Sequence, residues 1–391
     1  MYKLLFITNH PSPHMADLFR AIHRHPAMEL QVIFGASADP SRPWGSHAAG
    51  FPNTVLPRVP ISTPLPLNAG IIRYVLDHAR RGYRPIVDVY TMPSSLISAC
   101  VLVLARKPWL LFSEAPGLDY LAGGMKSSIR AFCVRQLAQR AAGVLAVSRN
   151  AVRTYRQICP EARVEHFQYY MEATKFREIR RDCTSRSKGL RFLFCGSLYP
   201  LKAPDEALMA SELLQENGLP HTLIFAGSGP MEAELRKYSH AHGLSNVEFR
   251  GSVAWHTRHE VFSDGDVLVH PTKHDGWGMV VAEALAAGMP VITTEACGAG
   301  VDFVRDGVNG FLLGSRHHTG SLAERMAHFI RFPAELERMG KAARKSVRDW
   351  TPEAGAGRLC QILSRWFPSR GVNPKARGRP PLFSAIRNEQ R

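Results

Sequence analysis

The sequence has no long hydrophobic run. Its longest apolar stretch, from Leu96 to Ala105, is interrupted by Ser98 and followed at once by two basic residues. A membrane-spanning helix needs roughly 18 apolar residues, so we expect this stretch to form a buried helix instead. The apolar run that follows Lys3 has only about five residues, and no small-x-small cleavage site comes after it. The N-terminal segment therefore predicts a first β-strand and a cytoplasmic protein.

The sequence also lacks paired cysteines. Seven cysteines are scattered over positions 100, 133, 159, 183, 195, 297 and 360, and none belongs to a CxxC pair. An odd, dispersed set is typical of buried or surface thiols in a reducing compartment. The cysteines therefore indicate neither a disulfide framework nor a zinc site.

Acidic residues are scarce in two parts of the chain. Residues 1–170 hold 19 Lys and Arg against 9 Asp and Glu, and residues 365–391 hold 7 against 1. Residues 171–364 are neutral, with 23 of each sign, so the whole excess of +16 lies outside them. This distribution predicts an anionic partner: acidic lipid headgroups, a lipid-linked phosphate or nucleic acid. Basic residues can equally be solvated surface, and that alternative stays open here.

The order of the segments predicts an α/β protein with two domains. Of its 391 residues 45% are hydrophobic, enough for two substantial cores. Strand-like and helix-like segments alternate along the first half, and the alternation restarts near residue 190 after a polar stretch. The expected strands are 3–8, 30–34, 86–90, 109–112, 144–147, 190–194, 221–225, 247–249, 266–270 and 290–293. The expected helices are 15–23, 127–140, 204–215, 231–242, 256–263 and 281–287. This rhythm is typical of two Rossmann-like domains with parallel sheets, which we expect to face each other across a deep interdomain cleft.

The domain boundaries follow from these shifts in composition. We expect an N-terminal domain over 1–170, a linker over 171–188 and a C-terminal domain over 189–352. A helix over 353–367 should return toward the N-terminal domain, and the Pro-, Arg- and Gly-rich residues 368–391 should form a basic, disordered tail. Residues 40–70, rich in Pro, Gly and Ser, are expected to form a long loop over the first domain.

Candidate binding residues follow the strands of the second half, because ligands bind beyond the carboxyl ends of parallel strands. After the strand that ends at Phe194, Gly196 allows a tight turn and Lys202 can reach a phosphate as a point charge. After the next strand, Gly227 and Gly229 open a helix whose N-terminus attracts anions. Tight strand-to-helix turns without a ligand explain such glycines equally well.

The strongest signal lies in residues 270–294, HPTKHDGWGMVVAEALAAGMPVITT. Two glycines and the amides after them stand at a strand-to-helix turn where a diphosphate can lie. Glu283 follows Asp275 by eight residues and falls near the first turn of a helix that begins near Met279. A carboxylate there can accept two hydrogen bonds from ribose hydroxyls. The structural alternative is that Asp275 caps the helix and Glu283 is solvated.

These residues resemble the family-4 glycosyltransferases, also called glycosyl transferases group 1. That family's signature is two acidic residues separated by seven, followed by EA-x-A-x-G-x-P-V-I. Here the pattern stands as Asp275, Glu283 and the run 284–292. The turn Gly307-Val-Asn-Gly310-Phe-Leu resembles the family's GxxGFL turn. The resemblance covers about residues 190–315 closely and the first half only loosely.

The resemblance implies the GT-B fold and a retaining sugar transfer from a nucleoside-diphosphate sugar without a metal. It implies that Asp275 and Lys202 are the catalytic residues, with Lys202 on the donor diphosphate and Asp275 beside the transferred sugar. Glu283 would bind the ribose. The remaining donor-binding positions would be Gly196, Ser197, Gly227, Gly229 and the amides of Gly278, Met279 and Val280. The leaving diphosphate would help to deprotonate the acceptor, so a cation and aligned amides must stabilise its growing charge. No cofactor is expected beyond the nucleotide sugar, which is a co-substrate.

Two positions depart from the family pattern. The first acidic residue is usually Glu and here is Asp275, one methylene shorter, which predicts a different sugar orientation. The residue after Gly196 is often Arg and here is Ser197. One phosphate-binding charge is therefore missing or supplied elsewhere, with Arg250 and Lys273 as candidates.

Weaker signals complete the sequence-based picture. In the first half, His14 and Glu114 each follow a strand and are candidate acceptor contacts, with an exposed loop histidine and a helix cap as the alternatives. Asp264-Gly-Asp266 spells a metal-binding DxD but opens a strand, so no metal is expected. The tail's Arg-Gly-Arg-Pro resembles an AT-hook, yet headgroup attraction explains the charge more simply, so no nucleic-acid partner is expected.

The leading hypothesis is sugar transfer to a lipid-linked or cell-surface polysaccharide acceptor. The enzyme would be cytoplasmic and peripheral at the inner face of an anionic membrane. The alternatives are a non-catalytic nucleotide-sugar-binding protein of the same fold, a sugar-nucleotide epimerase and a transferase with a soluble acceptor. The sugar, the base and the linkage depend on loops that the pattern does not place.

Overall fold

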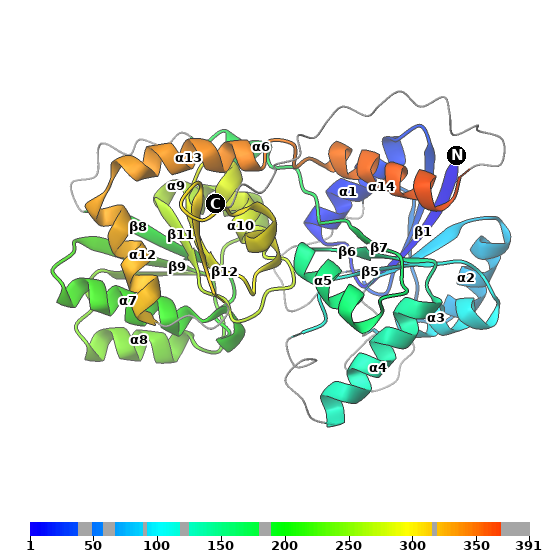
Figure 1. Ribbon diagram of the computed structural model, residues 1–391, viewed down its shortest axis with the longest axis horizontal. Helices are drawn as coiled ribbons and strands as arrows, with labels where there is room; N and C mark the ends of the chain where they lie inside the picture. Colours follow the sequence, from blue (N-terminus) through cyan, green and yellow to red (C-terminus); the bar gives the residue numbers. More distant parts are fainter. Residues whose placement is uncertain are drawn as a thin grey trace, which may run out of the picture.

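The computed structural model describes residues 1–37, 49–57, 67–88, 92–117, 125–179, 189–314 and 319–368. Figure 1 shows two lobes side by side, each built around a sheet with helices on both faces. The first lobe comes from the first half of the chain and the second lobe from the second half. The expected tail beyond residue 368, the second half of the linker and much of the 40–70 loop lie outside the described residues.

The first domain contains a seven-stranded parallel sheet with the order β3-β2-β1-β4-β5-β6-β7. Its strands are β1 (Tyr2–Thr8), β2 (Met28–Phe34), β3 (Asn53–Val55), β4 (Arg84–Asp88), β5 (Leu110–Ser113), β6 (Gly143–Ala146) and β7 (Val164–His166). Its helices are α1 (Pro13–Arg24), α2 (Ile71–Arg80), α3 (Pro93–Leu104), α4 (Met125–Arg140) and α5 (Arg149–Ile158), and the short helix α6 (Thr174–Arg177) lies in the expected linker and packs against the second domain. The strand order reverses between β1 and β4, where open α/β sheets bind ligands.

Strand β1 shows why the sheet is covered on both faces. Side chains alternate across a strand, so Leu4 and Phe6 enter the core beneath α1, and Leu5 and Ile7 enter the core beneath α2 and α3. All four side chains are buried. A strand without a polar face is stable only between two helical layers, which is the reason for the doubly wound architecture.

The second domain contains a six-stranded parallel sheet with the order β10-β9-β8-β11-β12-β13. Its strands are β8 (Leu190–Cys195), β9 (His221–Ala226), β10 (Val247–Gly251), β11 (Val267–His270), β12 (Val291–Thr294) and β13 (Gly310–Leu313). Its helices are η2 (Pro200–Lys202), α7 (Pro204–Glu216), α8 (Glu232–Ala241), η3 (Trp255–Thr257), α9 (Arg258–Asp264), α10 (Met279–Ala286), α11 (Gly298–Phe303), α12 (Thr319–Arg331) and α13 (Ala334–Ser346). The order of this sheet reverses between β8 and β11.

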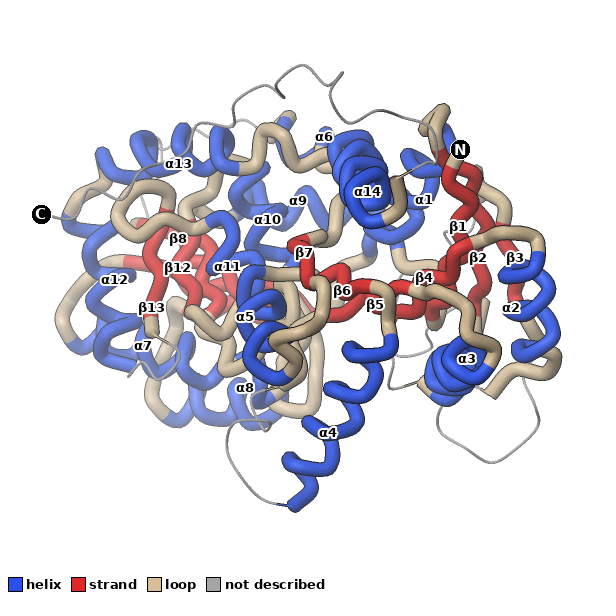
Figure 2. Tube along the Cα trace, turned by 45° about the vertical axis from the view of Figure 1, so that its right-hand side comes forward, coloured by secondary structure: helices blue, strands red, loops and turns tan. Residues whose placement is uncertain are grey.

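The last helix, α14 (Pro352–Trp366), leaves the second domain and packs against α1 of the first (Figures 1 and 2). The Thr351 hydroxyl caps its first turn by accepting a hydrogen bond from the Ala354 amide. Near its end, the Trp366 ring lies where a side chain on Gly143 would be, so β6 needs glycine there. Helix α14 thus ties the second half of the chain to the first domain.

The expectation that residues 96–105 form a buried helix is wrong in part. Helix α3 forms there, but Leu96 is 43% exposed and Leu104 is 83% exposed. The helix belongs to the outer layer, so only one face packs on the sheet, and that face includes Ser98 and Ala99. The helix expected at 256–263 also divides into η3 and α9. Across the described residues, no helix combines the length and the apolar character needed to cross a bilayer.

Candidate functional site

Loops that follow strands of the two domains meet at one place. Glu114 follows β5 of the first domain, and a side chain added at Gly276, after β11 of the second, would collide with its carboxylate. Nearby, a Cβ atom on Gly117 would lie 4.0 Å from the His274 ring. The loop that carries the acceptor candidate Glu114 therefore lies against the loop that carries Asp275, as expected for loops at the carboxyl ends of two facing sheets.

Tyr169 joins these loops. Its hydroxyl donates a hydrogen bond of 3.1 Å to Glu114 Oε1, and its ring packs edge-on against His14 with the ring centres 4.9 Å apart. The same ring lies 6.3 Å from the ring of Trp277 in the second domain. Sequence reasoning missed Tyr169, because β7 is only three residues long and gave no strand signal that would mark the residues after it.

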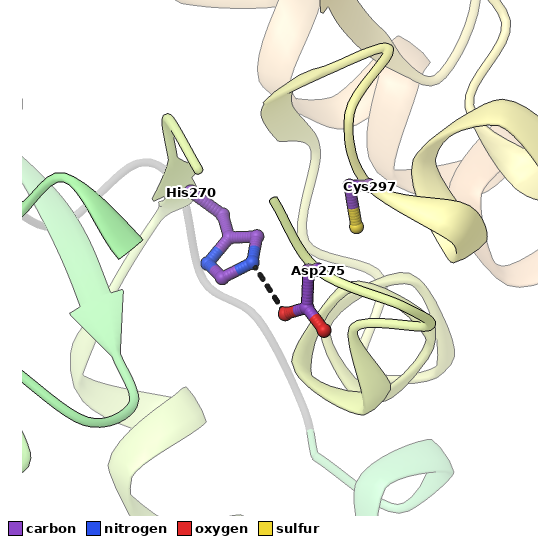
Figure 3. Close-up of side chains that lie close together, drawn as sticks. All are labelled: His270, Asp275 and Cys297. Carbon is purple, nitrogen blue, oxygen red and sulfur yellow. Dashed lines mark hydrogen bonds and ion pairs between the residues drawn. The ribbon is translucent and has the colours of Figure 1, made fainter. Parts of the chain in front are cut away.

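Lys202, Asp275 and His270 form a charged cluster in the second domain. The Lys202 ammonium lies 2.5 Å from Asp275 Oδ2, and His270 Nε2 lies 3.1 Å from the same oxygen (Figure 3 draws the histidine contact). Lys202 ends η2, which follows the Gly196 turn, whereas His270 ends β11 and is 2% exposed. The tight turn and the strand end thus bring one cation and one imidazole onto a single carboxylate oxygen.

The ionisation of this cluster follows from burial and from its contacts. Burial alone raises the pKa of Asp275, but the Lys202 ammonium and the His270 hydrogen bond outweigh it and hold that pKa below its usual range. Burial lowers the pKa of His270, and the contact with Asp275 opposes this shift only in part. The cluster therefore combines an anionic carboxylate, a cationic amine and a neutral imidazole.

His270, Asp275 and Cys297 also have metal-binding atoms within 4.8 Å of one another (Figure 3). A cation at this point would compete with the Lys202 ammonium for Asp275 Oδ2. Burial also raises the pKa of the Cys297 thiol to about 12, and the thiol donates a hydrogen bond of 3.3 Å to the Trp277 carbonyl. The expected independence from metal stays a prediction.

Helix α10 begins at Met279, as predicted, directly after Gly278 with φ 87°. Only glycine fits there, because the left-handed backbone disfavours other residues and a Cβ atom would collide with Cys297 Sγ. The first amides of a helix have no carbonyl partner within it, and they attract anions. The Gly278, Met279 and Val280 segment can therefore hold a phosphate or a sugar hydroxyl next to Asp275.

The glycines after β8 and β9 have different surroundings. A side chain on Gly227 would collide with the Gly196 carbonyl, and one on Gly229 would lie 2.5 Å from the Leu198 carbonyl. Close contact between the two loops therefore accounts for both. Gly196 has open space on the side where a Cβ atom would stand, and Ser197 is exposed. A ligand can approach the backbone at Gly196 and Ser197, and the donor contacts of Gly227 and Gly229 stay predictions.

Glu283 is fully buried, so the alternative of a solvated residue is wrong. Its carboxylate lies 2.7 Å from the guanidinium of Arg258, the first residue of α9. Burial raises the pKa of Glu283, and the Arg258 charge opposes that rise. Sequence reasoning missed Arg258, because it stands between Thr257 and His259 in no recognisable motif.

The two residues proposed to replace a phosphate-binding charge have carboxylate neighbours. Arg250 pairs with Glu248 at 2.9 Å and with Asp264 at 2.6 Å, all of them well exposed. Lys273 is half exposed and lies 4.0 Å from Glu206. In the DxD sequence, Asp264 therefore pairs with Arg250.

The second half of the chain is similar to a known family of proteins. Residues 175–346 match the family model described as glycosyl transferases group 1. The D-inositol 3-phosphate glycosyltransferase of Streptomyces griseus subsp. griseus is 34% identical over 182 residues, 44% of this chain. That match spans only 38% of the relative's own length.

Two solved structures share the fold over nearly the whole chain. The Anabaena protein HepE in complex with UDP and glucose has a TM-score of 0.71 at 18% identity, covering 93% of this chain and 100% of that one. Sucrose-phosphate synthase from Thermosynechococcus elongatus has a TM-score of 0.72 at 17% identity, covering 94% and 99%. At these identities the similarity establishes the fold alone, and it confirms the predicted class: GT-B, with two Rossmann-like domains.

Proposed function

We propose that this chain transfers a sugar from a nucleoside-diphosphate sugar to an acceptor bound between its domains, because its residues 175–346 match the family model of the glycosyl transferases group 1. The transfer proceeds with retention and without a metal. The observation that carries this proposal is the Lys202–Asp275 contact, which places a cation and a carboxylate at the start of α10. The loop that holds them meets Glu114 of the other domain.

The donor site is assembled from the second domain. The Lys202 ammonium has three N–H donors, so it can hold Asp275 and a diphosphate oxygen together. The amides that open α10 stabilise the same diphosphate as negative charge grows on it, and Asp275 accepts a hydrogen bond from the transferred sugar. Glu283, which is buried and paired with Arg258 in this structure, stays the proposed ribose ligand. The HepE structure contains UDP, so a UDP-sugar is the first donor to test.

The acceptor site is assembled from the first domain. Glu114 is held by the Tyr169 hydroxyl, and Tyr169 also packs on His14, so the three side chains form one unit opposite the donor loop. A carboxylate there can orient an acceptor hydroxyl toward the sugar. The leaving diphosphate then takes the hydroxyl proton. Positioning of both substrates between the domains supplies much of the rate enhancement.

A lipid-linked or cell-surface saccharide is the proposed acceptor class, reached at an anionic membrane. Helices α3 and α4 of the first domain support it. Leu104 is 83% exposed, Ile129 is 58% exposed and Phe132 is 62% exposed, while exposed Arg106 lies beside the end of α3. Figure 1 shows α4 extending away from the sheet. Apolar side chains beside basic ones are typical of surfaces that rest in lipid headgroups.

The direct test is nucleoside diphosphate release from a panel of UDP- and GDP-sugars incubated with a membrane extract. The proposal predicts release by the wild-type protein. It also predicts that the rate of release falls by about tenfold or more in Lys202→Ala and Glu283→Ala. Lys341→Ala replaces a surface lysine of α13 and is the matched control. Unimpaired release by both site variants would contradict the assigned roles.

Two outcomes would replace this function with another. Binding of a nucleotide sugar without release of product, even with the extract present, would indicate a non-catalytic binding protein. Turnover with a soluble acceptor such as D-inositol 3-phosphate, but none with the extract, would indicate a transferase that acts away from the membrane. The name of the Streptomyces relative makes that acceptor a useful probe.

A further inference from the structure

Arg258 is half-buried and lies near the carboxyl ends of the second sheet's strands, where the donor is proposed to bind. Its guanidinium is 2.7 Å from the Glu283 carboxylate and within hydrogen-bonding reach of the Cys195 thiol. Cys195 ends β8 and immediately precedes the Gly196 turn, and Glu283 lies on the second turn of α10. Arg258 therefore stands between the two loops that the donor diphosphate must contact.

The pair has hydrogen-bonding capacity that the described residues leave unused. Arg258 Nε is buried and donates to none of them, and neither Glu283 oxygen accepts a well-oriented hydrogen bond. A guanidinium carries five N–H donors, and burying such donors without partners costs free energy. The Arg258 side chain is 18% exposed, whereas Glu283 is completely buried. Arg258 is therefore the partly accessible member of the pair, and its guanidinium keeps a donor, Nε, that no described residue satisfies.

The sequence lacks an arginine where one is expected. Ser197 takes the position after Gly196, and it is exposed beside open space. Arg250 and Lys273 were the two candidates to replace this arginine. Arg250 is paired with two carboxylates, and Lys273 lies near the carboxylate of Glu206. Arg258 comes from a different element but lies next to the residue that begins the same turn.

We propose that Arg258 is the second phosphate-binding cation of the donor site, in place of an arginine at position 197. Glu283 positions it by accepting the ion pair on one side, which leaves the rest of the guanidinium for a phosphate oxygen. A planar fork of N–H donors binds phosphate with defined geometry, whereas Lys202 acts as a point charge. This inference rests on the proposed function, since it requires a nucleoside diphosphate as ligand.

The test separates phosphate binding from mere support of Glu283. Calorimetric titrations measure the affinities for UDP and for uridine, with GDP and guanosine as a second pair of ligands. The proteins compared are the wild type, Arg258→Met and Ser197→Arg/Arg258→Met. Removing a charged phosphate contact should weaken UDP binding by about 10- to 100-fold and leave uridine binding within about twofold. In the double variant, the guanidinium introduced by Ser197→Arg should restore most of the UDP affinity. Arg250→Met is the matched control and should bind UDP as the wild type does.

Leaving Glu283 buried without its partner can prevent folding of Arg258→Met, which thermal melting would show. The same comparison is then made between Glu283→Gln, which keeps the Arg258 charge, and Glu283→Gln/Arg258→Gln, in which both side chains are neutral. The further loss on replacing Arg258 should again affect UDP and spare uridine.

Three results would overturn the inference. Equal losses for UDP and uridine would make Arg258 only a support for Glu283, and unchanged UDP binding would remove it from the site. Loss of UDP affinity in Lys273→Ala, with none in the Arg258 variants, would assign the second charge to Lys273. In these cases wild-type binding persists, and the proposed function survives. Failure of the folded wild-type protein to bind UDP or GDP would overturn both.

Discussion

The Nζ atom of Lys202 lies 2.5 Å from Oδ2 of Asp275, although the two residues are on different loops of the second domain. His270 contacts the same oxygen from the end of β11. One carboxylate oxygen therefore holds a cation at the start of α10, where helix amides also converge. The carboxylate has two effects: it orients the ammonium, and it neutralises part of the charge that a diphosphate would otherwise meet.

Asp275→Asn should separate these two effects. The change removes the negative charge beside Lys202, so we expect nucleoside diphosphate affinity to stay unchanged or to rise. Turnover should fall by about 100-fold or more, because the sugar and the ammonium lose their fixed orientation. Calorimetry measures the first quantity and product release the second. Asp349→Asn, on the exposed segment after α13, is the control, and a parallel fall in affinity and turnover would argue against this division of roles.

Gly276→Ala should disturb the meeting of the two domains. The new methyl group would collide with the Glu114 carboxylate, so either that side chain or the whole domain must move. We expect lower turnover, with donor affinity nearly unchanged because Gly276 lies on the side that faces the first domain. The double variant Gly276→Ala/Glu114→Ala relieves the collision but removes a proposed acceptor contact. It should therefore be more stable than Gly276→Ala but no more active.

The control for this prediction is Gly357→Ala in α14, where a methyl group meets no atom within 4 Å. Kinetic constants for donor and acceptor, together with melting temperatures, are the measurements. A normal rate in Gly276→Ala would mean that the two loops separate during turnover.

His270 should make the second domain less stable in mild acid. Burial lowers its pKa in the folded protein, so the unfolded chain binds its proton first as the pH falls. The stabilising contribution is complete above the unfolded pKa of about 6.5 and is lost as the pH falls toward the lower, folded value. One such group changes the free energy of unfolding by up to about 1.4 kcal/mol per pH unit.

Urea unfolding over the range of about pH 7.5 to 5.5 tests this dependence. His270→Asn should be less stable than the wild type near neutral pH but should lose less stability on acidification. His23→Gln, at the exposed end of α1, should keep the wild-type slope. Identical slopes in all three proteins would show that His270 does not titrate with unfolding.

The fold was largely predictable from the sequence, because buried parallel strands produce short apolar runs. The run 190–194 became β8 (Leu190–Cys195) and the run 221–225 became β9 (His221–Ala226). Strands β3, β7 and β13 were missed, since each has only three or four residues and lies at an edge of its sheet, where apolar runs are shorter. The exposure of α3 was also missed, because hydrophobicity alone does not distinguish an outer helix from a buried one.

The candidate site was predictable only where the chemistry lies within a local motif. Lys202, Asp275 and Glu283 stood out through spacing and through resemblance, and the structure brings Lys202 and Asp275 together. Tyr169 and Arg258 were not found in this way. The partner of Tyr169, Glu114, lies 55 residues away in the sequence, and the partner of Arg258, Glu283, lies on another helix. Such contacts depend on how loops from different strands meet, which periodicity and spacing do not encode.

The exposed apolar side chains of α4 should contribute to membrane binding. Burying a large side chain contributes roughly 1.5–3 kcal/mol, so Ile129→Ser/Phe132→Ser should weaken binding to phosphatidylglycerol vesicles by about tenfold or more. Val55→Ser/Ile72→Ser is the matched control, because these residues are also exposed but lie on β3 and α2. Vesicles without phosphatidylglycerol should bind all three proteins weakly, since the basic first half requires anionic headgroups. Co-sedimentation at two salt concentrations gives both comparisons, and equal binding of the α4 variant and the wild type would exclude α4 as the contact surface.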